Sequence, residues 1–127
     1  MLENKRILFI CPKFFNYHNL ILDELKIKGA MVKYINEAPF NNIFVKYAIR
    51  KNSSLFKKKI NKYYFKEIDE LSQNFDYIFV IKGSTITEDV LKELRKKYSD
   101  TKFILYLWDS IRNIKGIERK FSYFDSI

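Results

Sequence analysis

Four short runs of apolar residues, separated by longer stretches with helical periodicity, constrain the fold of this chain more than any other feature. Each run has the length and the aliphatic and aromatic side chains of a strand that is covered on both faces. Strands that alternate with amphipathic helices form right-handed βαβ units, which produce a parallel sheet with helices on both sides. We therefore predict a doubly wound, Rossmann-like α/β fold with the strand order 2-1-3-4. The predicted strands are Arg6 to Cys11, Met31 to Ile35, Tyr77 to Ile81 and Phe103 to Trp108.

Apolar residues at helical spacing predict the elements between these strands. Gly29 is placed to end the first helix, because glycine readily adopts the left-handed conformation that follows a helix. Thr85 and Glu88 have the spacing of a capping box at the start of a later helix. The closing residues, FDSI, resemble the opening of a fifth strand. Helices are predicted at residues 18–29, 41–51, 56–71, 85–98 and 117–124.

Composition favours one folded domain over residues 1–127, because 47% of the residues are hydrophobic and there are only three Gly and two Pro. Cys11 is the one cysteine, so no internal disulfide can form, and its apolar surroundings indicate an inert buried thiol. We assign no metal, since one His and one Cys cannot build a zinc site. The N-terminal apolar run is too short to span a membrane and no cleavage site follows it, which predicts a cytoplasmic protein.

The formal net charge of +9 is concentrated in one segment. No acidic residue lies between Glu37 and Glu67, whereas the basic residues Lys46, Arg50, Lys51, Lys57, Lys58, Lys59, Lys62 and Lys66 do. Such a segment is either a solvated helix face or a surface that meets anions, and Lys46 to Lys66 could hold the protein at the inner face of an anionic membrane. Sequence-specific binding of nucleic acid is disfavoured, because lysine outnumbers arginine.

Doubly wound sheets bind ligands outside the carboxyl ends of the strands, where the strand order reverses. Three predicted loops meet at this edge, and His18 beside the first of them is the best candidate for a general base. Asp109 either acts as a base or holds a sugar hydroxyl, or else caps the following helix. Residues 82–85 either bind an anion or sugar oxygen or form a capped turn, and Trp108 either stacks on a sugar or belongs to the core. The candidate substrate-binding residues of these loops are Lys13, Lys82, Gly83, Ser84, Thr85 and Trp108.

Several ligand classes are disfavoured by missing motifs. The chain has no G-x-G-x-x-G after its first strand and no G-x-x-x-x-G-K-[ST], so neither a dinucleotide site nor a P-loop is predicted. The loop after the first strand lacks the hydroxyl-rich run expected around a flavin phosphate. A response regulator would need paired acidic residues there, and Cys11-Pro12-Lys13 supplies none.

The stretches PKFFNYHNLILDELKIKGAMVKYINEAP, FDYIFVIKGSTIT and LKELRKKYSDTKFILYLWDSIRNI, with the closing FDSI, resemble the N-terminal half of bacterial GT-B-type glycosyltransferases. The similarity is to CgeB-like proteins and to glycosyltransferases of capsule, exopolysaccharide and lipopolysaccharide biosynthesis. It implies a two-lobed enzyme in which this lobe receives a sugar or lipid-linked saccharide acceptor. The nucleotide-sugar donor would bind a C-terminal lobe, so no cofactor is expected here. The motif positions that the resemblance singles out are Lys82, Gly83, Trp108, Asp109, Ser110 and Asn113.

Two other functions stay open at this point. The chain could be a non-catalytic, flavodoxin-like domain that binds a small ligand or another protein. It could also be a nucleic-acid-binding module that uses its lysine-rich helix, although the scarcity of arginine disfavours this. The glycosyltransferase hypothesis assigns His18 and Asp109 as catalytic residues, with Lys13, Lys82, Gly83, Ser84, Thr85, Trp108, Ser110 and Asn113 around the acceptor.

Overall fold

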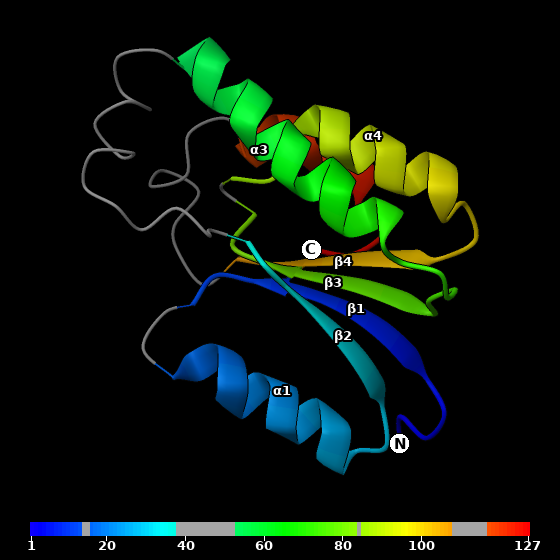
Figure 1. Cartoon of the computed structure of the whole chain (residues 1–127). Coiled ribbons are helices and arrows are strands. Elements are labelled where there is room, and N and C mark those ends of the chain that lie inside the picture. Colours follow the sequence, from blue (N-terminus) through cyan, green and yellow to red (C-terminus); the bar gives the residue numbers. More distant parts are fainter. Residues whose placement is uncertain (14–15, 38–52, 84, 108–116) are drawn as a thin grey trace.

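A computed structural model describes residues 1–13, 16–37, 53–83, 85–107 and 117–127 of the chain. Four parallel strands form one sheet in the order β2-β1-β3-β4, as the sequence predicts (Figure 1). The elements in chain order are β1 (Arg6–Cys11), α1 (Tyr17–Ile27), β2 (Met31–Asn36), α3 (Ser53–Asp69), β3 (Tyr77–Ile81), α4 (Glu88–Lys97), β4 (Lys102–Tyr106) and the 3-10 helix η2 (Ile117–Tyr123).

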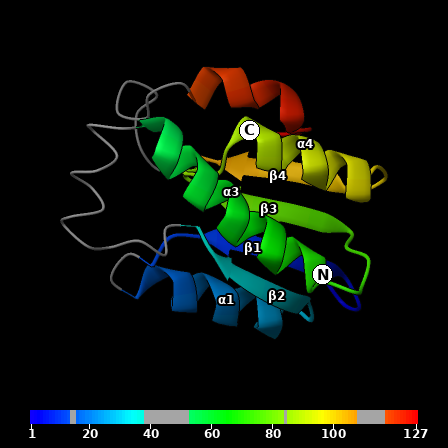
Figure 2. The same ribbon diagram turned by 45° about the horizontal axis from the view of Figure 1, so that its top comes forward.

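The helices divide unequally between the two faces of the sheet. Figures 1 and 2 show α3, α4 and η2 on one side and α1 alone on the other. This division follows from right-handed crossovers, because the chain moves outward from β1 to β2 and then turns back across β1 to reach β3. Among the described residues, the sheet therefore has a thick helical layer on one face and a single helix on the other.

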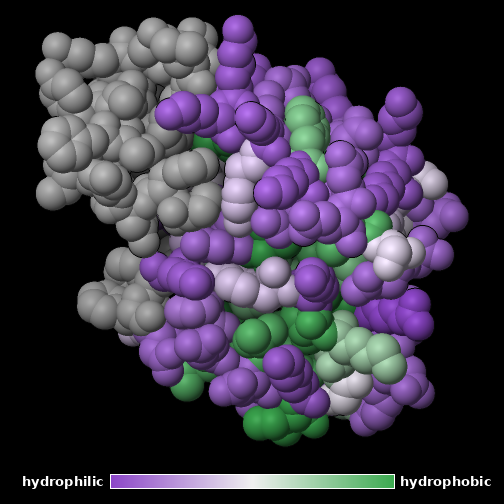
Figure 3. All heavy atoms as spheres, viewed as in Figure 1, coloured by the Kyte–Doolittle hydropathy of each residue, from purple (hydrophilic) through white to green (hydrophobic). Residues whose placement is uncertain are grey.

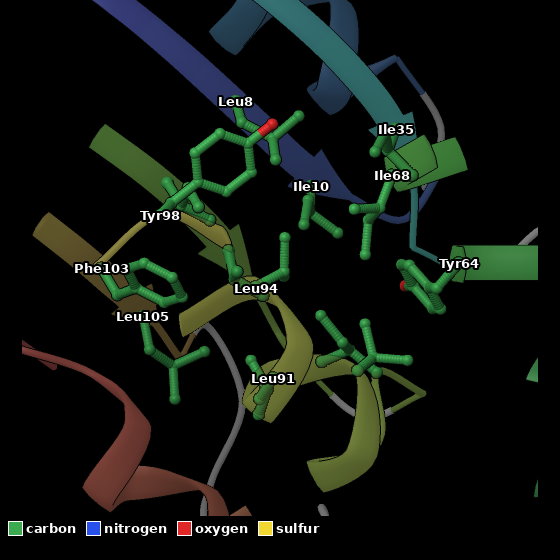
Figure 4. Packing of buried hydrophobic residues seen from close by; sticks show 14 of the residues in the cluster. Leu8, Ile10, Ile35, Tyr64, Ile68, Leu91, Leu94, Tyr98, Phe103 and Leu105 are labelled. Atoms are coloured by element: carbon green, nitrogen blue, oxygen red, sulfur yellow. The ribbon is translucent and has the colours of Figure 1, made fainter. Parts of the chain in front are cut away.

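The main core lies between the sheet and α3 and α4 (Figure 4). Alternate residues of a strand point to opposite faces, so Leu8 and Ile10 of β1 face this core while Phe9 faces α1. Tyr64 of α3 is fully buried and belongs to this core. Within the described ranges, the smaller cluster on the other side has three buried residues, Phe9, Cys11 and Ile81.

One prediction about an individual element is wrong. The N-cap of α4 is Thr87, whose Oγ1 accepts from Val90 N at 3.3 Å, so Thr85 and Glu88 do not form a capping box. Thr85 is instead held by contacts with Glu37, a residue distant in sequence. The predicted C-terminal helix is present over Ile117–Tyr123, and it is a 3-10 helix. The helix predicted at residues 41–51 lies outside the described residues.

The chain ends beside β4, as the predicted fifth strand requires. Ser126 forms a parallel bridge with Ile104, and Ser126 O accepts from Leu105 N at 2.9 Å. Arg95 of α4 fixes this terminal segment, since its Nη2 lies 3.0 Å from Asp125 Oδ2 and its Nε donates to Tyr123 O at 2.8 Å.

The lysines of α3 point away from the core, as the periodicity predicts: Lys57, Lys58, Lys59, Lys62 and Lys66 are all exposed. In Figure 3 the region of α3 and α4 is mainly hydrophilic, whereas hydrophobic residues reach the surface in the lower half of the view, around α1. No helix within the described ranges is long and apolar enough to cross a membrane.

Candidate functional site

The carboxyl ends of all four strands meet at one edge of the sheet, as expected for a parallel fold. Glu37, directly after β2, donates its N–H to Cys11 O at the end of β1 over 3.1 Å. Lys82, directly after β3, donates its N–H to Tyr106 O at the end of β4 over 2.9 Å. These cross-links hold the four strand ends side by side, so residues distant in sequence become neighbours here.

Glu37 is the central polar residue of this edge, and its side chain is fully buried, with 0% exposure. Its Oε1 accepts from Thr85 N at 2.7 Å, and its main-chain carbonyl accepts from the hydroxyls of Thr85 and Tyr64. Its Oε2 has no hydrogen-bond partner in the described part of the chain. Glu37 therefore ties the end of β2 to the β3–α4 connection and to α3.

Burial raises the pKa of the Glu37 carboxyl group above its ordinary value, because the charged form loses its hydration. The hydrogen bonds from Thr85 and the positive charge of Lys120 oppose this shift. Lys120 on η2 donates to Gly83 O at 2.8 Å, and burial lowers the pKa of its ammonium group. A carboxyl group and an amine with pKa values moved toward each other are typical of functional sites and also of structural charge networks.

Gly83 occupies a position at this edge that favours a residue without a side chain. Its φ is +67°, and a Cβ at this position would lie 3.1 Å from Leu105 Cδ1. The preceding Lys82 also has a positive φ, of 73°. Two successive left-handed residues turn the chain sharply after β3, so that the Gly83 carbonyl faces Lys120.

His18 lies on the other face of the sheet, near the start of α1. Its ring stacks on Tyr34 with 5.8 Å between the centroids, and Tyr34 donates its hydroxyl to Cys11 O at 2.7 Å. The His18 Nδ1 is buried and has no partner among the residues that the structure describes. Beneath it, burial and the nearby Glu37 raise the pKa of the Cys11 thiol to about 12. His18 is thus a packed aromatic residue on the α1 side, whereas Glu37 contacts the α3 side.

The structure brings together only some of the predicted site residues. Lys82, Gly83 and Thr85 lie at the Glu37 edge, whereas His18 packs on the opposite face and the side chain of Lys13 is exposed. The residues Ser84, Trp108, Asp109, Ser110 and Asn113 lie outside the described part of the chain. No observation bears on catalytic or substrate-binding roles for any of these residues, so those roles stay predictions.

Sequence reasoning missed Glu37 and Lys120. Glu37 could have been found by the rule that singled out Asp109, because it is also an acidic residue directly after a strand. Lys120 has no local signal, since only the folded chain places η2 beside Gly83. No group of three or more His, Cys, Asp or Glu that could hold a metal occurs among the described residues.

The Glu37 cluster can accept hydrogen bonds from the β3–α4 connection, which leads into the N-terminus of α4. Exposed backbone N–H groups near a helix N-terminus attract anions, and here a carboxyl group of the chain itself accepts from Thr85 N. The arrangement of the described residues therefore connects these elements through the buried Glu37 side chain.

Comparison with known proteins gives structural matches only. No protein-family model and no curated protein matches the chain. The response regulator protein TrrA from Thermotoga maritima in complex with Mg²⁺-BeF matches with a TM-score of 0.50 and 21% identity, over 96% of this chain and 83% of that chain. The complex of histidine kinase ThkA with TrrA matches with a TM-score of 0.51 and 21% identity, over 96% of this chain and 82% of that chain. At this identity the likeness shows the fold, a flavodoxin-like doubly wound domain.

The predicted resemblance to GT-B glycosyltransferases is wrong, because the structural matches are response regulators and no family model matches. The expectations that depended on this resemblance are wrong as well: sugar transfer, a saccharide acceptor and a role in cell-surface polysaccharide biosynthesis. The physical reason is that most of the quoted stretches carry the alternation of strands and helices that many doubly wound proteins share. The more specific LWDS-x-x-N segment lies mostly outside the described residues. The division into two lobes and the absence of a cofactor stay predictions.

Proposed function

We propose that this chain is a protein-interaction domain with a flavodoxin-like fold, which acts by binding a partner rather than by catalysis. The observation that supports this most directly is the unequal cover of the sheet: among the described residues, α3, α4 and η2 lie on one face and α1 alone on the other (Figures 1 and 2). Large hydrophobic side chains remain exposed on the thinly covered side, including Leu20 at 56% and Tyr106 at 55%. Exposed apolar surface of this kind marks interaction sites.

The matched structures agree with a protein partner, since TrrA was solved in complex with the histidine kinase ThkA. We do not extend the Mg²⁺-BeF binding of the matched TrrA structure to this chain. Magnesium requires oxygen ligands, and the residues that follow β1 here are Pro12 and Lys13. The nearby carboxylate, Glu37, is buried and bonded to Thr85 N. We therefore propose partner binding without metal-dependent phosphoryl chemistry.

Two finer points belong to the same proposal. We propose that the domain acts in the cytoplasm, in keeping with its free, buried Cys11. The outward lysines of α3 support a second, weaker contact with an anionic surface such as the inner face of a membrane. Binding to vesicles that contain anionic lipid, compared with vesicles of neutral lipid, tests that second contact.

Cross-linking of the chain in a lysate of its source organism, followed by mass spectrometry, tests the main proposal. We expect one protein to be cross-linked saturably to the labelled chain, and excess unlabelled chain added beforehand to prevent this cross-link. Absence of any saturable cross-link contradicts the proposal. In parallel, Mg²⁺ with beryllofluoride should leave the Tm of the chain unchanged, and a rise in Tm would show phosphoryl-type chemistry that the proposal denies.

A further inference from the structure

The exposed lysines of the helical layer form rows along α3 and α4. Lys58, Lys62 and Lys66 follow one another at steps of four residues on α3, so they lie in one row that is about 12 Å long. Lys92 and Lys96 form a second row on α4 with the same step. We call these five exposed residues, Lys58, Lys62, Lys66, Lys92 and Lys96, the basic helical face.

α3 and α4 lie side by side, which brings the two rows onto one surface (Figure 2). Lys57 Nζ of α3 lies 3.4 Å from Asp89 Oδ2 of α4, and farther along the helices Lys97 Nζ of α4 donates to Ile68 O of α3 at 2.7 Å. Both helices pack their apolar sides against the sheet. Their lysine rows therefore point outward together and form one broad cationic surface.

The charges of the basic helical face are not neutralised by neighbouring side chains. Within the described part of the chain, none of its five ammonium groups forms an ion pair, whereas Lys57 is paired with Asp89. Three exposed acidic residues remain nearby: Asp69 and Glu70 follow the α3 row at its C-terminal end, and Glu93 lies between the two lysines of α4. The face therefore keeps an excess of positive charge, which is largest away from the C-terminal end of α3.

The helical layer offers no apolar anchor among its described side chains. The large hydrophobic side chains that the structure shows as exposed, such as Ile27 and Tyr106, all lie outside α3 and α4. Protein interfaces depend on aromatic or aliphatic anchors, and single-stranded nucleic acid stacks on exposed aromatic rings. Arg95 is the one arginine of these two helices, and Asp125 and the Tyr123 carbonyl hold it. An extended surface of negative charge is therefore the partner that this face fits best.

We propose that the basic helical face holds the chain on the surface of a membrane that contains anionic phospholipid, with no side chain inserted and with α1 turned away from the lipid. Each lysine close to an anionic leaflet strengthens such binding about fivefold. The side of the sheet that carries α1 then stays accessible to a protein partner. The inference rests on the proposed function, whose second contact it assigns to particular residues and to one orientation.

The test uses the full chain and its sedimentation with lipid vesicles. The vesicles contain phosphatidylcholine alone, or phosphatidylcholine with about 30% of either phosphatidylserine or phosphatidylglycerol. We expect binding to both anionic mixtures, equal within about twofold, and none to the neutral vesicles, because charge rather than headgroup structure is recognised. Salt at about 500 mM should release the chain by screening. Free glycerophosphate at about 1 mM should not compete, since it presents no extended surface.

Two double variants locate the binding surface. Lys62→Gln with Lys66→Gln removes two charges from the basic helical face and should weaken vesicle binding at least about tenfold. Lys26→Gln with Lys102→Gln is the matched control, because it removes two exposed charges on the α1 side of the sheet. The control should weaken binding less than about twofold. All four positions are exposed, so the variants should fold, which circular dichroism verifies.

Asp89→Asn tests the same surface by a gain of binding. It removes the carboxylate that Lys57 contacts, so one more lysine becomes available beside the basic helical face, and binding should strengthen about fivefold. Asp23→Asn makes the same change at an exposed position of α1 and should alter binding less than about twofold.

The outcomes separate this inference from the proposed function. Equal losses in the two double variants would overturn the inference, because net charge and not one surface would then control binding. Tighter binding to double-stranded DNA than to vesicles at the same salt would overturn it in favour of nucleic acid. No binding to anionic vesicles would overturn both the inference and the second contact. A saturable cross-link to one protein would still support the main proposal in each of these cases.

Discussion

Glu37 illustrates how a side chain can occupy the place that a doubly wound fold offers to ligands. Its Oε1 takes the N–H of Thr85 at the carboxyl edge, and burial favours the protonated form of the acid. The same residue that closes the edge therefore makes the stability of the fold sensitive to pH.

Glu37→Gln tests this sensitivity. Because the pKa of Glu37 is raised in the folded state, the folded chain holds the proton more tightly than the unfolded chain does. The free energy of unfolding should therefore fall as pH rises from the unfolded pKa of about 4.3 to the raised folded pKa, and stay level above it. Gln has no such proton and still accepts from Thr85 N. Urea unfolding of both proteins between about pH 4 and pH 8 measures the difference in their free energies of unfolding. As pH rises, the stability of the variant should increase relative to that of the wild type.

A difference between the two proteins that does not change with pH would contradict the raised pKa. Glu37→Ala serves as the control for the hydrogen bond, because it leaves the Thr85 N–H without this acceptor. Relative to Glu37→Gln, which also lacks the titrating group, it should cost about 1–3 kcal/mol at every pH.

Cys11 provides a second prediction at this scale. The pKa of its thiol is raised to about 12 by burial and by Glu37, so the reactive thiolate is scarce at neutral pH. We expect a disulfide-exchange reagent at about pH 8 to label the native chain far more slowly than the chain in denaturant. Rapid labelling of the native chain would mean that the end of β1 opens readily to solvent.

At the scale of the elements, periodicity predicted the strands and the long helices well because each buries a face with its own repeat. β3 matches its predicted bounds, and α3 has the predicted apolar side with Ile60, Tyr64 and Ile68 buried. The helix ends were harder, since a cap depends on contacts that local sequence does not define. Thr85 and Thr87 are both plausible caps by type, and the contact between Thr85 and Glu37 leaves Thr87 as the cap.

Thr87→Ala tests the cap of α4. The substitution removes the Oγ1 acceptor for Val90 N and also the hydroxyl that donates to Asn61 Oδ1. We expect a loss of about 1 kcal/mol in the free energy of unfolding. Thr87→Ser, which keeps the hydroxyl, should retain most of that stability in the same urea titration. Equal stability of the Ala and Ser variants would show that the hydroxyl does not act as a cap.

At the scale of the molecule, the strand order followed from the sequence because right-handed crossovers leave few arrangements of alternating strands and helices. The sequence predicted the position of the candidate site, at the carboxyl edge of the sheet, but not its central residue. His18 and the Lys82 loop flank it from opposite faces of the sheet, and the residue at its centre, Glu37, acquires its role through long-range contacts with Thr85, Tyr64 and Lys120. Such contacts exist only after folding, so no local pattern reports them.

Two opposing properties of the whole molecule determine whether it associates with itself. Exposed apolar residues on the α1 side of the sheet, such as Tyr106, favour association, whereas a net charge of +9 on each copy opposes it. Repulsion reaches far at low ionic strength, where the Debye length is about 30 Å at 0.01 M salt, and is short-ranged at high salt. We therefore expect a monomer at about 20 mM salt and weak self-association at about 500 mM, measured by sedimentation velocity. Tyr106→Gln should reduce the association at high salt, whereas Ile27→Gln, at an exposed position on the side of α1 that points away from the sheet, should reduce it less. Association that is stronger at low salt would mean that ion pairs, and not the apolar face, bring the copies together.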